Sequence, residues 1–133
     1  MNIVVVDDDP VYLSLLAEIL TLYGHTVYRA PDGAAALEQL RNEQADLVIS
    51  DVSMPNMNGV TLHSMIREDR RLRRIPFVWN SAYSELRELL EVMDPSIDFK
   101  VDKATELSSL MHIITRVDAA RHVPNNVAVL ATA

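Results

Sequence analysis

The chain is 133 residues long and carries 19 acidic against 12 basic side chains, a formal charge of −7. Its residues are 49% hydrophobic but only 5% aromatic, which excludes a disordered chain and predicts a core of aliphatic side chains. The acidic balance argues against a free-standing binder of nucleic acids or anionic membranes, the length predicts one domain, and the lack of cysteine excludes disulfides and thiolate metal sites.

Short apolar runs alternate with segments of helical periodicity along the first 121 residues. In chain order the pattern predicts strand 3–6, a helix from 10 that ends at Gly24, strand 26–29, helix 33–43, strand 46–50, helix 59–71, strand 76–80, helix 84–93, strand 97–102 and helix 105–121. Strands that alternate with helices pair in parallel through right-handed crossovers. The sequence therefore predicts an α/β fold, a doubly wound (βα)5 arrangement with a parallel five-stranded sheet.

The predicted helix at residues 10–24 has a second apolar line besides its core stripe, formed by Tyr12, Leu15, Ile19 and Leu22. One stripe is enough to face the sheet, so we expect the second line to be covered. The candidates are a docking partner, a second copy of the chain, and the apolar tail at 122–133 that follows the folded domain at 1–121. No stretch is long and apolar enough to span a bilayer and no export signal is present, so we expect a soluble, cytoplasmic protein.

Polar residues stand directly after four of the predicted strands. They are Asp7, Asp8 and Asp9 after the first strand, Asp51 after the third, Ser81 after the fourth and Lys103 after the fifth. Because the carboxyl ends of parallel strands meet at one edge of the sheet, we expect these side chains to lie together. Converging carboxylates need a cation and suit Mg²⁺, while a lysine and a hydroxyl suit phosphoryl oxygens. The pattern predicts a phosphoryl-transfer site.

Three stretches and one lysine carry a resemblance to a known family: Ile3 to Pro10 (IVVVDDDP), Asp51 to Gly59 (DVSMPNMNG), Pro76 to Ala82 (PFVWNSA) and Lys103. Over residues 1–121 the chain resembles the receiver domains of two-component response regulators, such as the chemotaxis response regulators. The resemblance implies the flavodoxin-like strand order 2-1-3-4-5.

The family resemblance also implies a phosphorylation-dependent signalling switch rather than a conventional enzyme, one that catalyses only its own phosphorylation and dephosphorylation. Asp51 would accept a phosphoryl group from a sensor histidine kinase or a phosphotransfer protein. Lys103 and Ser81 would contact the phosphoryl oxygens, and the surface of the fourth helix and fifth strand would carry the output.

The same resemblance implies a Mg²⁺ site beside the acceptor. Asp8 would bind the ion directly, and Asp7 would act largely through a water molecule. Asp51 and the backbone carbonyl of Ser53 would complete the protein's share of the ligands.

Two positions depart from the usual receiver pattern. Ala104 stands where receivers usually have a proline joined by a cis bond, and we expect a trans bond because a cis peptide there would cost about 2.5–4 kcal/mol. Lys100 stands where an aromatic switch residue is usual, and Phe99 would point to the opposite face of the strand. Both departures favour an alternative, a pseudo-receiver that serves only as an interaction module.

A second alternative is a phosphohydrolase of the haloacid-dehalogenase type. In that reading Asp7 is the nucleophile, Asp9 is the general acid, and Ser50 or Ser81 with Lys103 contacts the phosphate. The chain lacks the later acidic pair that such an enzyme needs for Mg²⁺, which weighs against it.

Two groups of basic residues receive no functional role from the sequence. The histidines lack metal-ligand spacing and are interpreted as solvated or at the edge of the core: His25, His63, His112 and His122. The arginines are interpreted as a solvated helix end: Arg67, Arg70, Arg71, Arg73 and Arg74.

Overall fold

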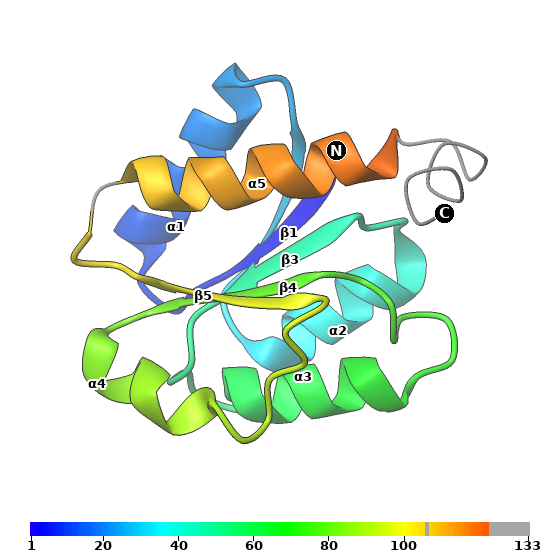
Figure 1. Cartoon of the computed structure of the whole chain (residues 1–133), viewed down its shortest axis with the longest axis vertical. Helices are drawn as coiled ribbons and strands as arrows, with labels where there is room; N and C mark the ends of the chain where they lie inside the picture. The colour runs from blue at the N-terminus through cyan, green and yellow to red at the C-terminus, as the bar shows by residue number, and fades with distance from the viewer. Residues whose placement is uncertain (106, 123–133) are drawn as a thin grey trace, which may run out of the picture.

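The computed structural model describes residues 1–105 and 107–122 (Figure 1). The strands are β1 (Asn2–Val6), β2 (Thr26–Ala30), β3 (Leu47–Ser50), β4 (Phe77–Ser81) and β5 (Asp98–Asp102). The helices are α1 (Pro10–Leu22), α2 (Gly33–Asn42), α3 (Gly59–Glu68), α4 (Tyr83–Leu86) with the 3₁₀ helix η1 (Arg87–Leu89), and α5 (Leu107–Arg121). Within the described residues no helix has the length and apolar character needed to cross a membrane.

The strands form one sheet in the order β2-β1-β3-β4-β5, and all four neighbouring pairs are parallel. This confirms the predicted fold class and strand order. The first and third strands are almost entirely apolar, apart from Asn2 and Ser50, because both of their faces are covered, the pattern expected of central parallel strands.

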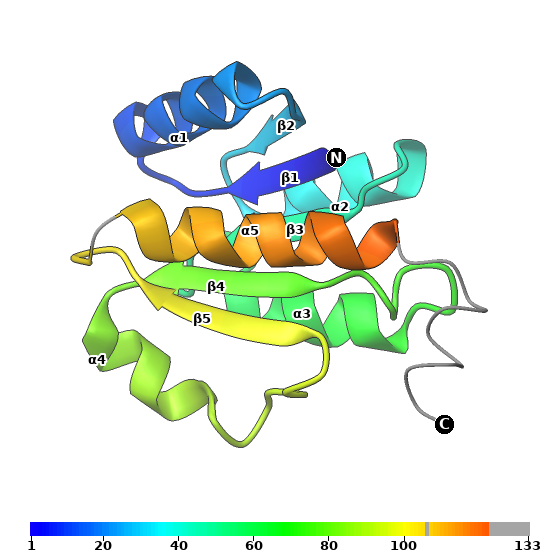
Figure 2. The ribbon, with the colours of Figure 1, turned by 45° about the horizontal axis from the view of Figure 1, so that its top comes forward.

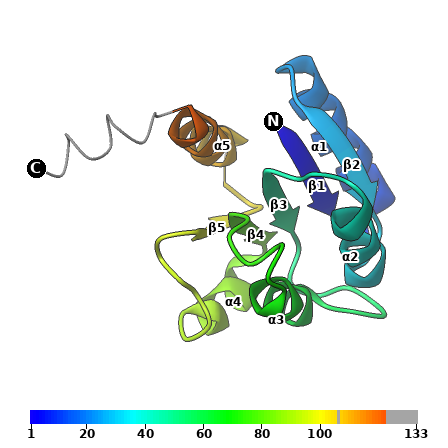
Figure 3. The ribbon, with the colours of Figure 1, turned by 90° about the vertical axis from the view of Figure 1, so that its right-hand side faces the viewer.

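Helices cover the two faces of the sheet as two layers (Figures 2 and 3). Each layer has its own hydrophobic core. On one face α1 and α5 pack against the sheet through residues such as Leu16, Leu20 and Ile114. On the other face α2, α3 and α4 pack around Phe77 and Trp79. Alternate side chains of each central strand enter opposite cores, so the sheet holds both layers in register.

Two predicted helices are shorter in the structure. The segment predicted as helix 84–93 is one α-turn followed by a 3₁₀ turn that ends at Leu89. Leu86 and Leu89 are both buried, as a three-residue repeat requires, whereas Leu90 is exposed instead of buried as expected. The helix predicted to reach residue 71 ends at Glu68, because the carboxylate of Asp69 accepts a hydrogen bond from the Arg71 amide and closes a turn.

The interpretation of the basic residues needs correction at two positions. His63 is buried and contacts the ring of Phe77 edge-on and the ring of Trp79 at a tilt, with ring centroids 5.1 and 4.4 Å away. Its Nε2 lies 2.9 Å from a carboxylate oxygen of Asp98, and Arg67 Nη2 lies 2.5 Å from the other oxygen. Arg67 therefore does not belong to a solvated helix end, and His63 is a core residue.

The second apolar line of α1 is covered only in part by the described residues. Tyr12 is half-buried, but Leu15 is 54% and Leu22 is 86% exposed. Between α1 and α5 lies a cleft of about 170 Å³, lined in part by Tyr12, Leu15 and Ile19. The predicted cover by the tail concerns residues 123–133, which lie outside the described part of the chain.

Candidate functional site

Asp7, Asp51 and Lys103 stand one position beyond the ends of their strands, where the main-chain ladder still holds them, and Ser81 is the last residue of β4. The amide of Asp7 donates to the carbonyl of Ala30, and that of Asp51 donates to the carbonyl of Val6, at 3.1 and 3.0 Å. The amide of Lys103 donates to the carbonyl of Ser81 at 2.9 Å. The sheet thus fixes the backbone from which each of these side chains projects.

Three carboxylates converge at this edge of the sheet. Oxygen atoms of Asp7, Asp8 and Asp51 lie within 4.8 Å of one another. Asp7 is buried, Asp51 is half-buried and Asp8 is exposed, so the cluster runs from the core to solvent. Burial raises the pKa of the Asp7 carboxyl, while hydrogen bonds from Lys103 and from the Asp9 amide act in the opposite direction.

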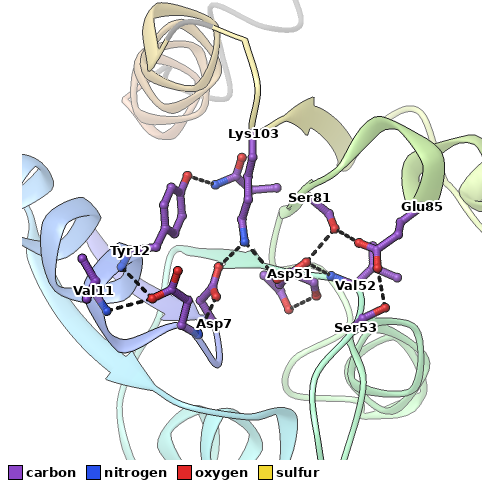
Figure 4. Close-up of polar contacts among 12 residues, drawn as sticks. Asp7, Val11, Tyr12, Asp51, Val52, Ser53, Ser81, Glu85 and Lys103 are labelled. Carbon is purple, nitrogen blue, oxygen red and sulfur yellow. Dashed lines mark hydrogen bonds and ion pairs between the residues drawn. The ribbon is translucent and has the colours of Figure 1, made fainter.

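Lys103 bridges two members of the acidic cluster (Figure 4). Its Nζ lies 2.5 Å from Oδ2 of Asp7 and 2.9 Å from Oδ2 of Asp51. Burial alone would lower the pKa of Lys103, but its hydrogen bonds to these two carboxylates raise it above the ordinary value. The lysine therefore stays a cation.

The ring of Tyr12 lies under the Lys103 ammonium, with the ring centroid 4.6 Å from Nζ. The Tyr12 hydroxyl accepts a hydrogen bond of 2.5 Å from Asn80 Nδ2.

The second oxygen of Asp51 faces hydrogen-bond donors. Its Oδ1 accepts from the Val52 amide at 2.7 Å and from the Ser81 hydroxyl at 2.6 Å. The chain passes closely behind this carboxylate, because an added Cβ at Gly59 would lie 2.1 Å from the Asp51 carbonyl oxygen. Only glycine fits there, and the tight passage fixes the loop that follows β3.

The donor set fits a hard divalent cation. All three side chains of the cluster offer carboxylate oxygens, and one lysine cannot neutralise three carboxylates. Mg²⁺ is commonly held by one or two carboxylates together with phosphate oxygens and water. Asp7, Asp8 and Asp51 are the residues that would hold it.

The structure brings together five of the six predicted site residues: Asp7, Asp8, Asp51, Ser81 and Lys103. Ser53 lies in the loop after β3, and its hydroxyl donates to Glu85 at 2.5 Å. The Lys103–Ala104 bond is trans, as predicted, since the described residues contain no cis peptide. Phe99 packs on the α1 and α5 side of the sheet, on the face of β5 opposite to Lys100, as predicted, and Lys100 is exposed.

Asp9, the general acid of the hydrolase alternative, caps a helix instead. Its carboxylate accepts hydrogen bonds from the amides of Val11 and Tyr12 and so satisfies the free donors at the start of α1. Sequence reasoning missed the contacts of three residues: Tyr12, Asn80 and Glu85. Only sequence spacing could have pointed to two of these residues. Glu85 lies one helical turn after Ser81, and Asn80 directly precedes Ser81.

A family model described as "Response regulator receiver domain" matches residues 3–115. The sensor histidine kinase RcsC of Salmonella typhi is 36% identical over 110 residues, which are 83% of this chain and 11% of that protein. The transcriptional regulatory protein ZraR of Escherichia coli K12 is 31% identical over 124 residues, which are 92% of this chain and 27% of that protein. The chain thus spans between about a tenth and a quarter of these two relatives.

Among solved structures, the response regulator TrrA of Thermotoga maritima superposes with a TM-score of 0.76 at 29% identity. The match covers 87% of this chain and 97% of TrrA. That protein was crystallised in complex with Mg²⁺-BeF.

Proposed function

Because the chain belongs to the response regulator receiver domain family, we propose that it is a phosphorylation-dependent switch with Asp51 as the phosphoryl acceptor. Receiver domains take phosphoryl groups from histidine kinases, and the donor proposed here is a phosphohistidine of a sensor kinase or phosphotransfer protein. The observation that carries the proposal is the position of Asp51, with an acidic cluster and a lysine on one side and the Ser81 hydroxyl on the other.

In the proposed reaction a carboxylate oxygen of Asp51 forms a bond to phosphorus, and the bond between phosphorus and the imidazole nitrogen of the donor breaks. The ring leaves with the bonding electron pair and takes up a proton. The transition state is loose and its charge lies on the equatorial phosphoryl oxygens, so catalysis is mainly alignment and charge neutralisation. Lys103 supplies a fixed cation for these oxygens, and Ser81 supplies a hydrogen-bond donor.

The acids of the cluster have the complementary task. Asp7, Asp8, Asp51 and the backbone carbonyl of Ser53 are the proposed ligands of Mg²⁺, which would neutralise the carboxylates and the incoming phosphoryl oxygens. Without a cation three carboxylates would repel a phosphoryl donor. Lys103 already offsets part of that repulsion through its ion pairs with Asp7 and Asp51.

The proposed output begins at Ser81. A phosphoryl group adds roughly −1.5 to −2 charges and new acceptor oxygens, which would draw the hydroxyl of Ser81 and the ammonium of Lys103. Both residues border the α4 and β5 surface, since Ser81 precedes α4 and Lys103 follows β5. Because Lys100 replaces the usual aromatic, the change at this surface would not be relayed by an aromatic side chain.

Intact-mass spectrometry tests the proposal. The protein is incubated with Mg²⁺ and acetyl phosphate, and Asp51→Asn is treated in parallel. We expect a single phosphoryl adduct on the wild type and none on the variant.

The same measurement separates the alternatives. Lack of an adduct on the wild type would favour a pseudo-receiver that acts only as an interaction module. Continuous release of phosphate that persists in Asp51→Asn but depends on Asp7 would favour a hydrolase.

A further inference from the structure

Glu85 contacts the proposed phosphorylation site without belonging to the acceptor, metal or lysine machinery (Figure 4). It lies in the single α-turn of α4 and is half-buried. One carboxylate oxygen accepts a hydrogen bond of 2.5 Å from the Ser53 hydroxyl, and the other contacts the hydroxyl of Ser81. Glu85 thereby joins α4 to the loop after β3 and to the end of β4.

The contact with Ser81 sets up a competition. The same hydroxyl oxygen lies 2.6 Å from Oδ1 of Asp51, yet a serine hydroxyl has only one proton to donate. Asp51 and Glu85 are therefore rival acceptors for one donor. A phosphoryl group on Asp51 needs that donor, so it must take the hydroxyl away from Glu85.

Charge acts in the same direction as this competition. The phosphoryl group brings roughly −1.5 to −2 charges to a point beside Ser81, where the Glu85 carboxylate already stands. Like charges at such short range repel, and Lys103 lies on the other side of Asp51. Nothing in the described contacts of Glu85 offsets the added negative charge.

The start of α4 has little else to hold it in place. Ala82, the residue at its amino-terminal cap, provides no side-chain hydrogen bond. The helix is anchored farther along, where Leu86 and Leu89 are buried in the core beneath it. Losing the Glu85 contacts would free the start of α4, while Leu86 keeps the end of α4 in place and Leu89 keeps η1 in place.

We propose that Glu85 competes with the phosphoryl group for the hydrogen bond from the Ser81 hydroxyl. It accepts hydrogen bonds from the hydroxyls of Ser81 and Ser53 while Asp51 is unmodified, and phosphorylation breaks these contacts and releases the start of α4. This inference rests on the proposed function, and it adds the residue that links phosphorylation to the α4 surface.

The test compares Glu85→Ala with Glu88→Ala, a matched control at an exposed acid three residues farther along the chain. Phosphorylation rates are measured by intact mass with Mg²⁺ and acetyl phosphate. Hydrogen exchange of the α4 amides is measured before and after phosphorylation. Glu85→Gln, which keeps the size of the side chain and removes its charge, serves if the alanine variant folds poorly.

We expect Glu85→Ala to be phosphorylated roughly tenfold faster than the wild type, because Ser81 is free to donate to the phosphoryl oxygens. Without phosphorylation, the α4 amides of Glu85→Ala should already exchange faster than those of the unmodified wild type. In the wild type, we expect this increase only after phosphorylation. Glu88→Ala should match the wild type in both measurements.

Two outcomes would overturn the inference, and only one of them would also overturn the proposed function. Equal phosphorylation rates and equal exchange in Glu85→Ala and the wild type would refute the role of Glu85 while leaving Asp51 as acceptor. No adduct on the wild type would refute the proposed function, and this inference with it.

Discussion

Replacing Asp98 by asparagine removes one negative charge from the buried cluster at the start of β5 and changes almost nothing in side-chain size. The Asp98 carboxylate is fully buried and accepts from Nε2 of His63, Nη2 of Arg67 and the Asp94 amide, at 2.9, 2.5 and 2.7 Å. Since a carboxylate only accepts, the Nε2 of His63 carries the proton. The side-chain NH₂ group of asparagine would face one of these three hydrogen-bond donors. The Arg67 guanidinium would lose its counter-ion.

The loss of unfolding free energy in Asp98→Asn depends on the burial of the Arg67–Asp98 ion pair. Removing one member of a buried ion pair costs about 3–5 kcal/mol, and the Arg67 side chain is only 17% exposed. Arg67 keeps hydrogen bonds to the carbonyls of Arg73 and Ile75, which places the expected loss near the lower end, about 3 kcal/mol. Typical domains are stable by about 5–15 kcal/mol, so the variant should unfold far more readily.

The pH dependence gives a second signature. Burial would raise the pKa of Asp98, but the hydrogen bonds from His63, the Asp94 amide and Arg67 hold it below its ordinary value of 3.8. A lowered pKa in the folded state means that the stabilisation is complete above the ordinary value and is lost as the pH falls through the folded pKa. The difference in stability between wild type and Asp98→Asn should therefore shrink in strong acid.

Urea unfolding measures this loss. Trp79 is the only tryptophan of the chain, is fully buried and contacts the ring of His63, so its fluorescence reports on this region. Circular dichroism controls for local quenching. Asp118→Asn serves as control, because Asp118 forms a surface pair with Arg121 that should contribute less than about 1 kcal/mol. A loss in Asp98→Asn no larger than in the control would refute the reasoning.

Three further changes probe the site itself. Gly59→Ala should lose about 1–3 kcal/mol in urea unfolding because its Cβ would overlap the Asp51 carbonyl; unchanged stability would contradict the tight loop. Tyr12→Leu should lower the pKa of Lys103, measured by NMR, because leucine removes the ring beneath the ammonium. Tyr12→Phe keeps the ring and should leave this pKa unchanged. The same pKa of Lys103 in both variants would exclude the cation–π contact. Asp8→Asn should weaken Mg²⁺ binding at least about tenfold by calorimetry, and an unchanged affinity would remove Asp8 from the ligands.

The sequence was sufficient for the fold because its signals are local. β1, β3 and β4 are largely apolar runs with polar residues at or just after their ends, and parallel topology brings those ends together. The α4 region was predicted less well, because Leu86, Leu89 and Leu90 have the i, i+3, i+4 spacing of an α-helix, whereas a 3₁₀ turn places only Leu86 and Leu89 on one face. Packing against the core selects the 3₁₀ turn and exposes Leu90.

Contacts between distant polar residues could not be predicted in the same way. Asp98 meets His63 and Arg67 across 35 and 31 residues of chain, and no local pattern marks such a pair. The ring of Tyr12 is a similar case, since helical spacing assigned it to an apolar line and only the fold shows it beneath Lys103. The acidic cluster was predictable because strand ends, unlike these contacts, have a fixed place in a parallel sheet.

The position of Lys100 has a consequence for assembly. β5 is an edge strand, so one of its main-chain rows pairs with no other strand of the sheet, and the exposed Lys100 belongs to this strand. Charged side chains on edge strands discourage pairing with further strands and so protect a sheet from growing by aggregation. A lysine at this place therefore favours contacts made through side chains and helices over extension of the sheet into a second molecule.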